Sequence, residues 1–430
     1  MHLNPIRCTI SQTLVLLIWR PVDYSATGVH DNLPMTLDFQ QIRAQIIEMG
    51  KNAPLRERQL RELRKNARQL LEMYAQDLER LRQKVDQVVR LYEPSVRSAI
   101  PVDEALNARF PLPSLPGQAT ILAADGSQIF PDRHAEVEYG LINIGVIQMC
   151  YGESTTPIAK VTSKLFYDED LYTTTGVVSD SLLALRRDLN ERTLLANLAS
   201  QASPPPITFT DGLMEIWGPR EMGSEEASEF QKSLDEYLQV LSDMHELKAI
   251  TAGYVDKPSS RLVVRLLEIA MTPETELSEI KQYHPFRRIY DVDLYSPLLD
   301  SGERSPVFAV QSPSSKVYTN ELALHFFYLN VGRPDHPWIV RVEIPAWVAG
   351  DPKMLNDLHA VLVHQCQVMG SRPYPYVLHR AHETALVSFQ EKEQITHMIT
   401  AEMHRRGVPV GERSNKQSAK DLPGTTRYRR

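Results

Sequence analysis

The order of the segments between residues 119 and 211 constrains the fold of this chain more than any other feature. Three apolar or alternating stretches predict strands close enough in sequence for an antiparallel meander. An amphipathic stretch then predicts a helix, and a fourth apolar stretch follows three prolines. These segments are strands at 119–124, 138–149 and 160–167, a helix at 179–199 and a strand at 207–210. Because crossover connections between parallel strands are right-handed, the fourth strand is expected beside a meander strand, the first being the natural neighbour.

This succession is the opening of a ribonuclease H-like α/β layer, a mixed sheet flanked by helices. The second half of the chain extends it. Further helices are predicted at 225–244, 261–270, 352–368 and 377–399, and further strands at 249–255, 307–310, 322–329 and 338–344. The sequence has no internal repeat, so the expected fold is one mixed layer rather than a repeat array.

A long helical arm is predicted before this layer. Residues 37–91 are rich in Glu, Arg, Gln and Leu, with apolar residues at mostly three- or four-residue spacing. That pattern predicts one coiled-coil-like helix or an antiparallel pair broken near Asn52 to Pro54. The arm either packs on the rest of the chain or serves dimerisation or partner docking, and the sequence leaves both open. The predicted division is a leader at 1–34, the arm at 35–100, the α/β domain at 101–405 and a basic flexible tail at 406–430.

The charge balance limits how this chain can contact nucleic acid. With 47 basic and 54 acidic side chains the formal net charge is −7, which excludes a uniformly basic DNA-coating protein and leaves local contact in a groove or cleft. Cys8, Cys150 and Cys366 are too few and too far apart for a disulfide framework, which fits a reducing cytoplasm. The apolar run Thr13 to Trp19 is too short to span a membrane. Met35, just before the helical pattern, is a candidate start of translation.

Two Asp-Gly pairs supply the first candidate site. Asp125 follows the first predicted strand, Asp211 follows the fourth, and a glycine follows each of them. If these strands are parallel neighbours, the two carboxylates lie side by side at the sheet edge where ligands gather in open α/β layers. Neighbouring carboxylates repel one another unless a cation lies between them, and hard divalent ions prefer oxygen ligands. An Asp-Gly pair is also an ordinary turn signal, but two pairs after matching strands favour a site.

Helices supply two more candidates. Stepping about 100° per residue along the helix before Asp211 places Glu191 among leucines, where an acid is costly unless it is paired or bound to a metal. An intrahelical ion pair with Arg187 is the alternative, and Asp188 is the nearest rival for the same role. His382 lies on an apolar helical face near the end of the chain. A histidine there is either a satisfied core residue or a ligand.

Four segments occur in an order that resembles the motifs of the NurA nuclease family, and the resemblance runs from about residue 40 to residue 400. They are Leu122-Ala-Ala-Asp125-Gly126-Ser127-Gln128, Thr210-Asp211-Gly212, Arg341-Val-Glu343-Ile-Pro345-Ala-Trp347 and Tyr374-Pro-Tyr376-Val-Leu-His379-Arg-Ala-His382-Glu383. The resemblance implies a ribonuclease H-like fold, a homodimer, manganese-dependent cleavage of DNA and a HerA-type hexameric ATPase translocase as partner. It also implies that Tyr374 belongs to the active site and that four residues bind the metal. These four are Asp125, Glu191, Asp211 and His382.

Such ligands suit hydrolysis of a phosphodiester by two metal ions. Two ions about 3.5–4 Å apart lower the pKa of the attacking water and neutralise the departing oxygen. The nitrogen ligand His382 favours Mn²⁺ over Mg²⁺, and Tyr374 is expected to orient the phosphate or the water. The resemblance to the NurA family implies the activity of a 5′–3′ exonuclease and/or single-strand endonuclease in DNA end resection and double-strand break repair.

Positive charge and stacking groups for DNA must come from outside the acidic site. Lys257, Arg261 and Arg187 are candidates for contact with backbone phosphates. Tyr254 and Tyr376 are candidates for stacking on bases at an unpaired end. Ordinary surface residues are the alternative for each of them. Lesser candidates are Arg186, Arg380 and Trp217, and the tail carries Lys416, Lys420, Arg427, Arg429 and Arg430.

Two other functions compete with a nuclease. Asp-Gly-Ser after a strand also resembles the phosphate loop of actin-like and sugar-kinase ATPases, but the chain has only 19 glycines and neither GxGxxG nor GxxxxGK[ST]. The second alternative is a nuclease-like subunit that binds DNA ends or a motor without cutting. The presence of Asp125, Asp211 and His382 together weighs against it.

Overall fold

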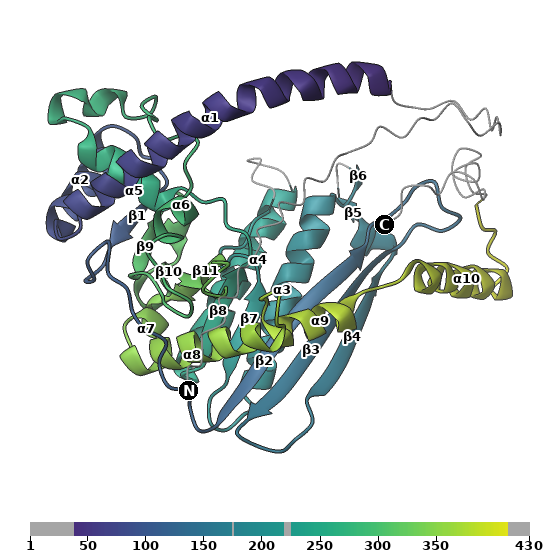
Figure 1. The fold of residues 1–430 in the computed structure, drawn as a ribbon. Helices are drawn as coiled ribbons and strands as arrows, with labels where there is room; N and C mark the ends of the chain where they lie inside the picture. Colours follow the sequence, from purple (N-terminus) through teal and green to yellow (C-terminus); the bar gives the residue numbers. More distant parts are fainter. Residues whose placement is uncertain (1–37, 174–175, 219–224, 412–430) are drawn as a thin grey trace, which may run out of the picture. The chain divides into compact units, whose positions relative to one another are not determined.

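The computed structural model describes residues 38–173, 176–218 and 225–411, and its main feature is a nine-stranded mixed sheet (Figure 1). The strand order is β1-β9-β10-β11-β8-β7-β2-β3-β4, and β5 with β6 forms a separate pair. The strands are β1 Ser98–Pro101, β2 Ala119–Ile129, β3 Gly140–Tyr151, β4 Ile158–Phe166, β5 Tyr172–Thr173, β6 Gly176–Val177, β7 Ile207–Asp211, β8 Ile250–Val255, β9 Phe308–Gln311, β10 Leu324–Asn330 and β11 Ile339–Pro345. The predicted leader, Cys8 and the five basic residues of the tail lie outside the described residues.

The topology confirms the predicted ribonuclease H-like layer. Strands β2, β3 and β4 form the antiparallel meander, and β7 returns parallel to β2 with Ala124 opposite Thr210. Strand β8 adds parallel to β7. The predicted end of the first strand at Ala124 is wrong, because pairing with β3 carries β2 through Ile129 after the pairing with β7 has stopped. Asp125 therefore lies within β2, at the end of its parallel pairing.

Helices cover both faces of this sheet. They are α1 Phe39–Met73, α2 Leu78–Leu91, α3 Asp180–Ala199, α4 Glu225–Glu246, α5 Leu262–Met271, α6 Asp291–Tyr295, α7 Ala346–Ala349, α8 Pro352–Val368, α9 Tyr376–Ala385 and α10 Phe389–Arg405, with short 3₁₀ turns η1 Asp168–Leu171, η2 Glu274–Glu279, η3 Ser315–Val317 and η4 Asn320–Leu322. The single helix predicted at 377–399 is two helices. Leu386 is extended, and Ser388 with Glu391 forms a capping box that begins α10. No helix in the described part of the chain has both the length and the apolar character needed to cross a bilayer.

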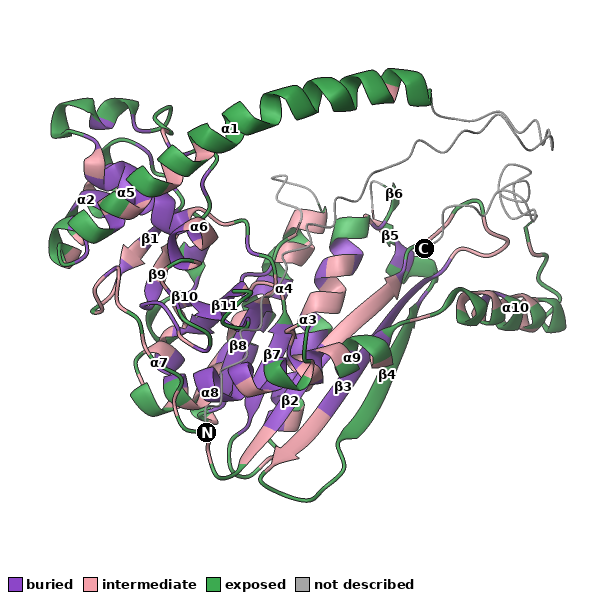
Figure 2. Cartoon of the chain, viewed as in Figure 1, coloured by how far each residue is buried: buried purple, intermediate pink, exposed green. Residues whose placement is uncertain are grey.

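Two glycines show which helix covers which face of the sheet. A Cβ at Gly126 of β2 would meet Arg187 of α3, whereas a Cβ at Gly145 of β3 would meet the backbone of α9 at Ala381. Helix α4 packs against α3 in the same layer, and α9 crosses β2 and β3 on the opposite face (Figure 1). Buried residues concentrate along β2, β3, β7 and β8 between these layers (Figure 2). The parallel pairing of β2 with β7 thus stops where β7 and β8 reach their carboxyl ends, in a sheet covered on both faces.

The helical arm differs from its prediction in where it breaks. Helix α1 runs through Pro54, since one internal proline removes a single hydrogen bond, and the break falls between Met73 and Leu78. The chain divides into two compact units between Glu57 and Arg58. Within the second unit α2 packs against α5 and β1. The domain boundaries proposed from the sequence remain predictions.

His359 gives the fold a pH dependence that can be measured. It is fully buried in α8, its Nε2 donates to the Gly302 carbonyl at 2.7 Å, and burial lowers its pKa to about 4. Because this pKa lies below the ordinary value, the stability contributed by the neutral ring is present above pH ~6.5 and is lost as the pH falls through about 4. We expect wild-type protein to lose about 3 kcal/mol of unfolding free energy relative to His359→Gln over this window. Urea titrations at several pH values measure the difference, and parallel curves for both proteins would contradict it.

Candidate active site

Asp125 and Asp211 lie on neighbouring parallel strands. Each follows directly on the last register pair between β2 and β7, Ala124 with Thr210. The pKa of Asp211 is raised, first by desolvation among the protein atoms around its carboxyl and then by the negative charge of Asp125. Two carboxylates held together in this way repel one another, and either a proton or a cation relieves the repulsion.

Helix α9, near the C-terminal end of the described chain, brings His382 to this pair. Its Nδ1 lies 2.6 Å from Asp125 Oδ2, and its side chain is 61% exposed. The alternative of a satisfied core histidine is therefore wrong. The approach depends on Gly145, opposite Asp125 in β3, because a Cβ there would lie only 2.6 Å from the Ala381 carbonyl oxygen. A side chain at Gly145 would push α9, and His382 with it, away from the sheet.

Glu191 lies in α3 against the opposite face of β2. It is only 4% exposed, and its Oε1 is 3.3 Å from Arg187 Nε, so the intrahelical ion pair expected as the alternative from the sequence is present. Burial, followed by the charge of Asp188, raises the pKa of Glu191 to about 8. The negative charge of Asp125 acts in the same direction. Glu191 therefore shares the electrostatic environment of the aspartate pair while its own carboxylate is held by Arg187.

Two further groups border Asp211. Tyr374 lies beside Asp211, where its hydroxyl lowers the pKa of the carboxyl, and its ring packs edge-on against Tyr254 with centroids 5.4 Å apart. Burial and then the charge of Asp211 raise the pKa of Tyr374, so its hydroxyl stays protonated. Asp256, one residue beyond β8, also raises the pKa of Asp211 and accepts a hydrogen bond from Trp338 Nε1 at 3.0 Å. Sequence reasoning missed Asp256, although it follows a third apolar strand in the manner of the two aspartates.

The residues predicted to contact DNA have different environments. Tyr254 is fully buried in β8 between β7 and β11, with its hydroxyl 3.7 Å from Cys366 Sγ, so the predicted stacking on bases is wrong. Arg187 is engaged by Asp188 and Gln128, and Arg261 by Ile289 and Glu268. Lys257 is exposed just beyond β8, and Tyr376 is half-buried at the start of α9.

The lesser candidates are held in surface pairs. Arg186 forms an ion pair with Glu229 at 2.6 Å, and Arg380 pairs with Glu383 on its own helix. The Arg97 guanidinium lies over the exposed ring of Trp217, 5.2 Å from its centroid. In the described part of the chain, each of these side chains therefore has its contacts with groups other than Asp125 and Asp211.

The donor set suits a divalent cation, although the side chains are not arranged as a ready-made cage. Among the residues that the structure describes, no three His, Cys, Asp or Glu side chains are grouped closely enough to hold an ion. Asp125 is bonded to His382, and Glu191 is paired with Arg187. Asp125 and Asp211 nonetheless lie on neighbouring strands with His382 bonded to Asp125, while Glu191 lies against the other face of β2. Hard divalent ions take oxygen ligands with an occasional histidine. The residues that could hold such an ion are Asp125, Glu191, Asp211 and His382.

The fold, with the carboxylates of Asp125 within β2 and Asp211 at the end of β7, defines a protein of the ribonuclease H-like nuclease class. The model of the NurA domain matches residues 119–387, which is more than half of the chain and contains all of these carboxylates, Tyr374 and His382. This chain belongs to the NurA family, as the order of its motifs had indicated. No curated protein matches it.

Several solved structures are similar to this chain at low sequence identity. The NurA nuclease from Sulfolobus solfataricus is 13% identical, with 70% of this chain and 88% of that chain covered and a TM-score of 0.45. The catalytic domain of human endonuclease V is 12% identical, with 75% and 98% covered and a TM-score of 0.30. The ribonuclease LC9-RNase H1 is 13% identical, with 34% and 63% covered and a TM-score of 0.21. The family assignment rests on the matched domain.

Gly126 is the position where a single methyl group should disturb the site. A Cβ there would lie 2.6 Å from Arg187 Cγ and 2.7 Å from Glu191 Oε1. Overpacking of this kind costs about 1–3 kcal/mol and displaces the side chains involved. We expect Gly126→Ala to lower DNA cleavage about tenfold or more, measured with Gly117→Ala as control because a Cβ at Gly117 meets nothing within 4 Å. Full activity in Gly126→Ala would show that the position of Glu191 does not matter for cleavage.

Proposed function

We propose that this chain is a divalent-metal-dependent deoxyribonuclease that hydrolyses phosphodiester bonds at DNA ends, with Mn²⁺ as the preferred ion. The single observation that carries the proposal is the pair of carboxylates, Asp125 and Asp211, on neighbouring parallel strands of a NurA-family domain. The proposal includes 5′–3′ exonuclease and/or single-strand endonuclease action in DNA end resection and double-strand break repair. The similar Sulfolobus protein is itself described as a nuclease.

Asp125, Asp211 and Glu191 would hold the ions together with His382. When bound, such ions lower the pKa of an attacking water and neutralise the departing oxygen. The protonated hydroxyl of Tyr374, beside Asp211, would donate to the Asp211 carboxylate and favour its charged form. Arg187 does the same for Glu191. These bonds preorganise the acids before the substrate arrives, which reduces the cost of reorganisation during the reaction.

A cleavage assay tests the proposal. Purified protein is incubated with end-labelled single- and double-stranded DNA in Mn²⁺, in Mg²⁺ or in excess EDTA. We expect cleavage in Mn²⁺ and none in EDTA. ATP turnover without cleavage would instead support the actin-like ATPase alternative, and tight DNA binding without cleavage would support the catalytically silent subunit.

The proposal extends to partners and location. A homodimer and a HerA-type hexameric translocase are the partners expected from family membership, and the cytoplasm is the expected compartment. Light scattering of the purified chain tests the dimer. Co-elution with a HerA-type ATPase from the same organism tests the motor partnership.

A further inference from the structure

A basic cavity lies beside the acidic edge, and the proposed chemistry does not use it. Its volume is about 640 Å³. The cations that line it are Arg97, Lys257, Arg261, Arg265, Lys281 and Arg341. Glu93 is the only Asp or Glu among the described lining residues. A cavity of this size is within the range that holds a nucleotide-sized ligand, and its lining selects for negative charge.

The cavity continues the row of strand ends that carries the aspartates. Leu213, two residues beyond Asp211, lines it, and so do Val255 and Lys257 at the end of β8. Arg341 of β11 is the register partner of Val255 and lines it too. Strands β8 and β11 lie beyond Asp211 on the side away from Asp125. Asp211 pairs with Tyr254 and Arg341 pairs with Val255, so Val255 and Arg341 face the opposite side of the sheet from Asp211.

The cations of the cavity outnumber the acids that pair with them. Glu268 pairs with both Arg261 and Arg265. Three of the other four cations have one acidic partner each. Those three pairs are Arg341 with Glu343 at 2.5 Å, Arg97 with Glu215 at 3.4 Å and Lys281 with Glu93 at 3.5 Å. Lys257 has no ion-pair partner among the described residues, and the buried Nε of Arg341 has no hydrogen-bond acceptor there. The six cations therefore exceed these four acids by two positive charges.

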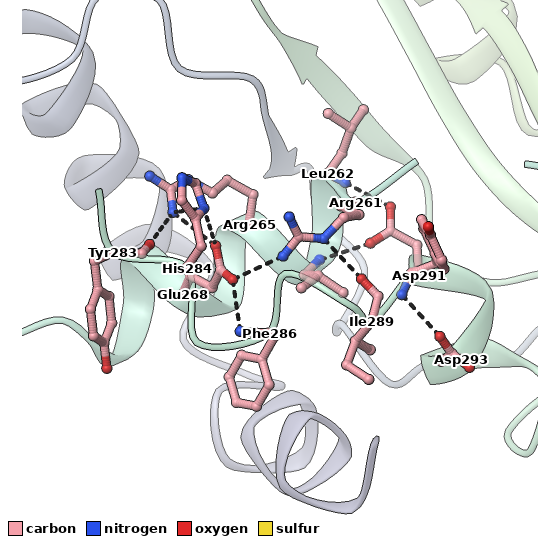
Figure 3. Close-up of polar contacts among 12 residues, drawn as sticks. Arg261, Leu262, Arg265, Glu268, Tyr283, His284, Phe286, Ile289, Asp291 and Asp293 are labelled. Atoms are coloured by element: carbon pink, nitrogen blue, oxygen red, sulfur yellow. Dashed lines mark hydrogen bonds and ion pairs between the residues drawn. The ribbon is translucent and has the colours of Figure 1, made fainter. Parts of the chain in front are cut away.

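Two of the guanidinium groups are held in place by a buried acid. Figure 3 shows Arg261 and Arg265 donating to Glu268. The buried Glu268 also accepts from the Phe286 amide at 3.1 Å. Helix α5 begins at the cavity, but Asp291 already accepts from its Leu262 and Val264 amides at 2.8 Å. The attraction for an anion thus comes from side chains fixed by a buried acid, not from a free helix terminus.

We propose that this cavity binds the terminal phosphomonoester of a DNA strand whose nearby diester lies at Asp125 and Asp211, an inference that rests on the proposed nuclease function. A phosphomonoester carries about −1.5 to −2 charges at neutral pH, whereas an internal diester carries one, so the surplus of two positive charges matches a strand end. Arginine and lysine are the side chains that bind phosphate best.

Binding measured without cleavage tests this inference. Wild-type protein in EDTA is titrated into fluorescent single-stranded oligonucleotides of one sequence that carry a 5′-phosphate, a 3′-phosphate or only hydroxyl ends. We expect the strand phosphorylated at one of its ends to bind about tenfold more tightly than the hydroxyl strand. Lys257→Gln should reduce this ratio to about twofold or less, whereas Lys232→Gln on the exposed face of α4 should leave it unchanged. Lys257 is exposed, so thermal denaturation should match wild type.

The outcomes separate this inference from the nuclease proposal. Equal affinity for all three strands would overturn the strand-end site even if the protein cuts DNA in Mn²⁺. A preference that survives Lys257→Gln would overturn it as well. A free deoxynucleoside monophosphate that binds as tightly as the phosphorylated strand would show a nucleotide site rather than a strand-end site. A preference for phosphorylated strand ends in a protein that never cuts DNA would instead overturn the proposed nuclease function. The cavity would still be a binding site for a strand end.

Discussion

Replacing Asp125 with asparagine is expected to lower Mn²⁺-dependent DNA cleavage about a thousandfold, a loss of about 4 kcal/mol of transition-state stabilisation. Asparagine keeps the size and one carbonyl oxygen but removes the negative charge that the proposed ions require. It also removes the repulsion that raises the pKa of Asp211. The variant should therefore fold at least as well as wild type in the absence of metal, so that activity is lost without loss of structure.

Single-turnover cleavage of labelled single-stranded DNA, read beside the melting temperature, measures this prediction. Asp235→Asn is the matched control, because it makes the same chemical change on the exposed face of α4. The proposal fails if Asp125→Asn keeps more than a tenth of wild-type activity. A variant that loses activity only together with its melting transition would leave Asp125 a structural residue, and it would equally count against the proposal.

Glu268→Ala is expected to lower the free energy of unfolding by about 3–5 kcal/mol, because removing one partner of a buried ion pair leaves the other charge uncompensated. Glu268 is fully buried and accepts from Arg261 at 3.0 Å and Arg265 at 2.8 Å (Figure 3). The substitution would leave two guanidinium groups without their acid. Both would also lose the support that fixes them in the basic cavity.

Urea denaturation monitored by circular dichroism measures the loss. Glu268→Gln should be intermediate, because its amide oxygen still accepts hydrogen bonds but carries no charge. Glu276→Ala, in the exposed turn η2, is the control and should change the unfolding free energy by less than about 0.5 kcal/mol. An effect of Glu268→Ala no larger than that of the control would show that Arg261 and Arg265 need no acid between them. The charge surplus assigned to the cavity would then be wrong.

The aspartate pair could be predicted because it depends on strand order. Apolar runs ending in Asp125 and Asp211, separated by a helix, lead through the right-handed crossover to neighbouring parallel strands, and the register of β2 with β7 agrees. The buried position of Glu191 followed from helical periodicity in the same way. Its role as a ligand stays a prediction, since the structure shows its carboxylate paired with Arg187.

Other features could not be predicted, because they depend on which surfaces meet. Nothing local distinguishes Tyr254, which is buried between two strands, from a tyrosine on an edge strand. The position of His382 depends on the close packing of α9 over Gly145. Asp256, by contrast, could have been predicted, because it follows the apolar strand β8 and the rule that found Asp211 applies to it as well.

The sequence by itself determined most of the elements, their order and the two aspartates of the neighbouring parallel strands, because hydrophobic periodicity is a local property of the chain and the handedness of a crossover is nearly constant. The basic cavity was decided only by the tertiary structure. It joins Arg97, Lys257 and Arg341, which are far apart in sequence, and its charge surplus depends on acids such as Glu268 that reach its cations only after folding. Coulombic balance at a site is set by distances between side chains, and those distances exist only in the folded chain.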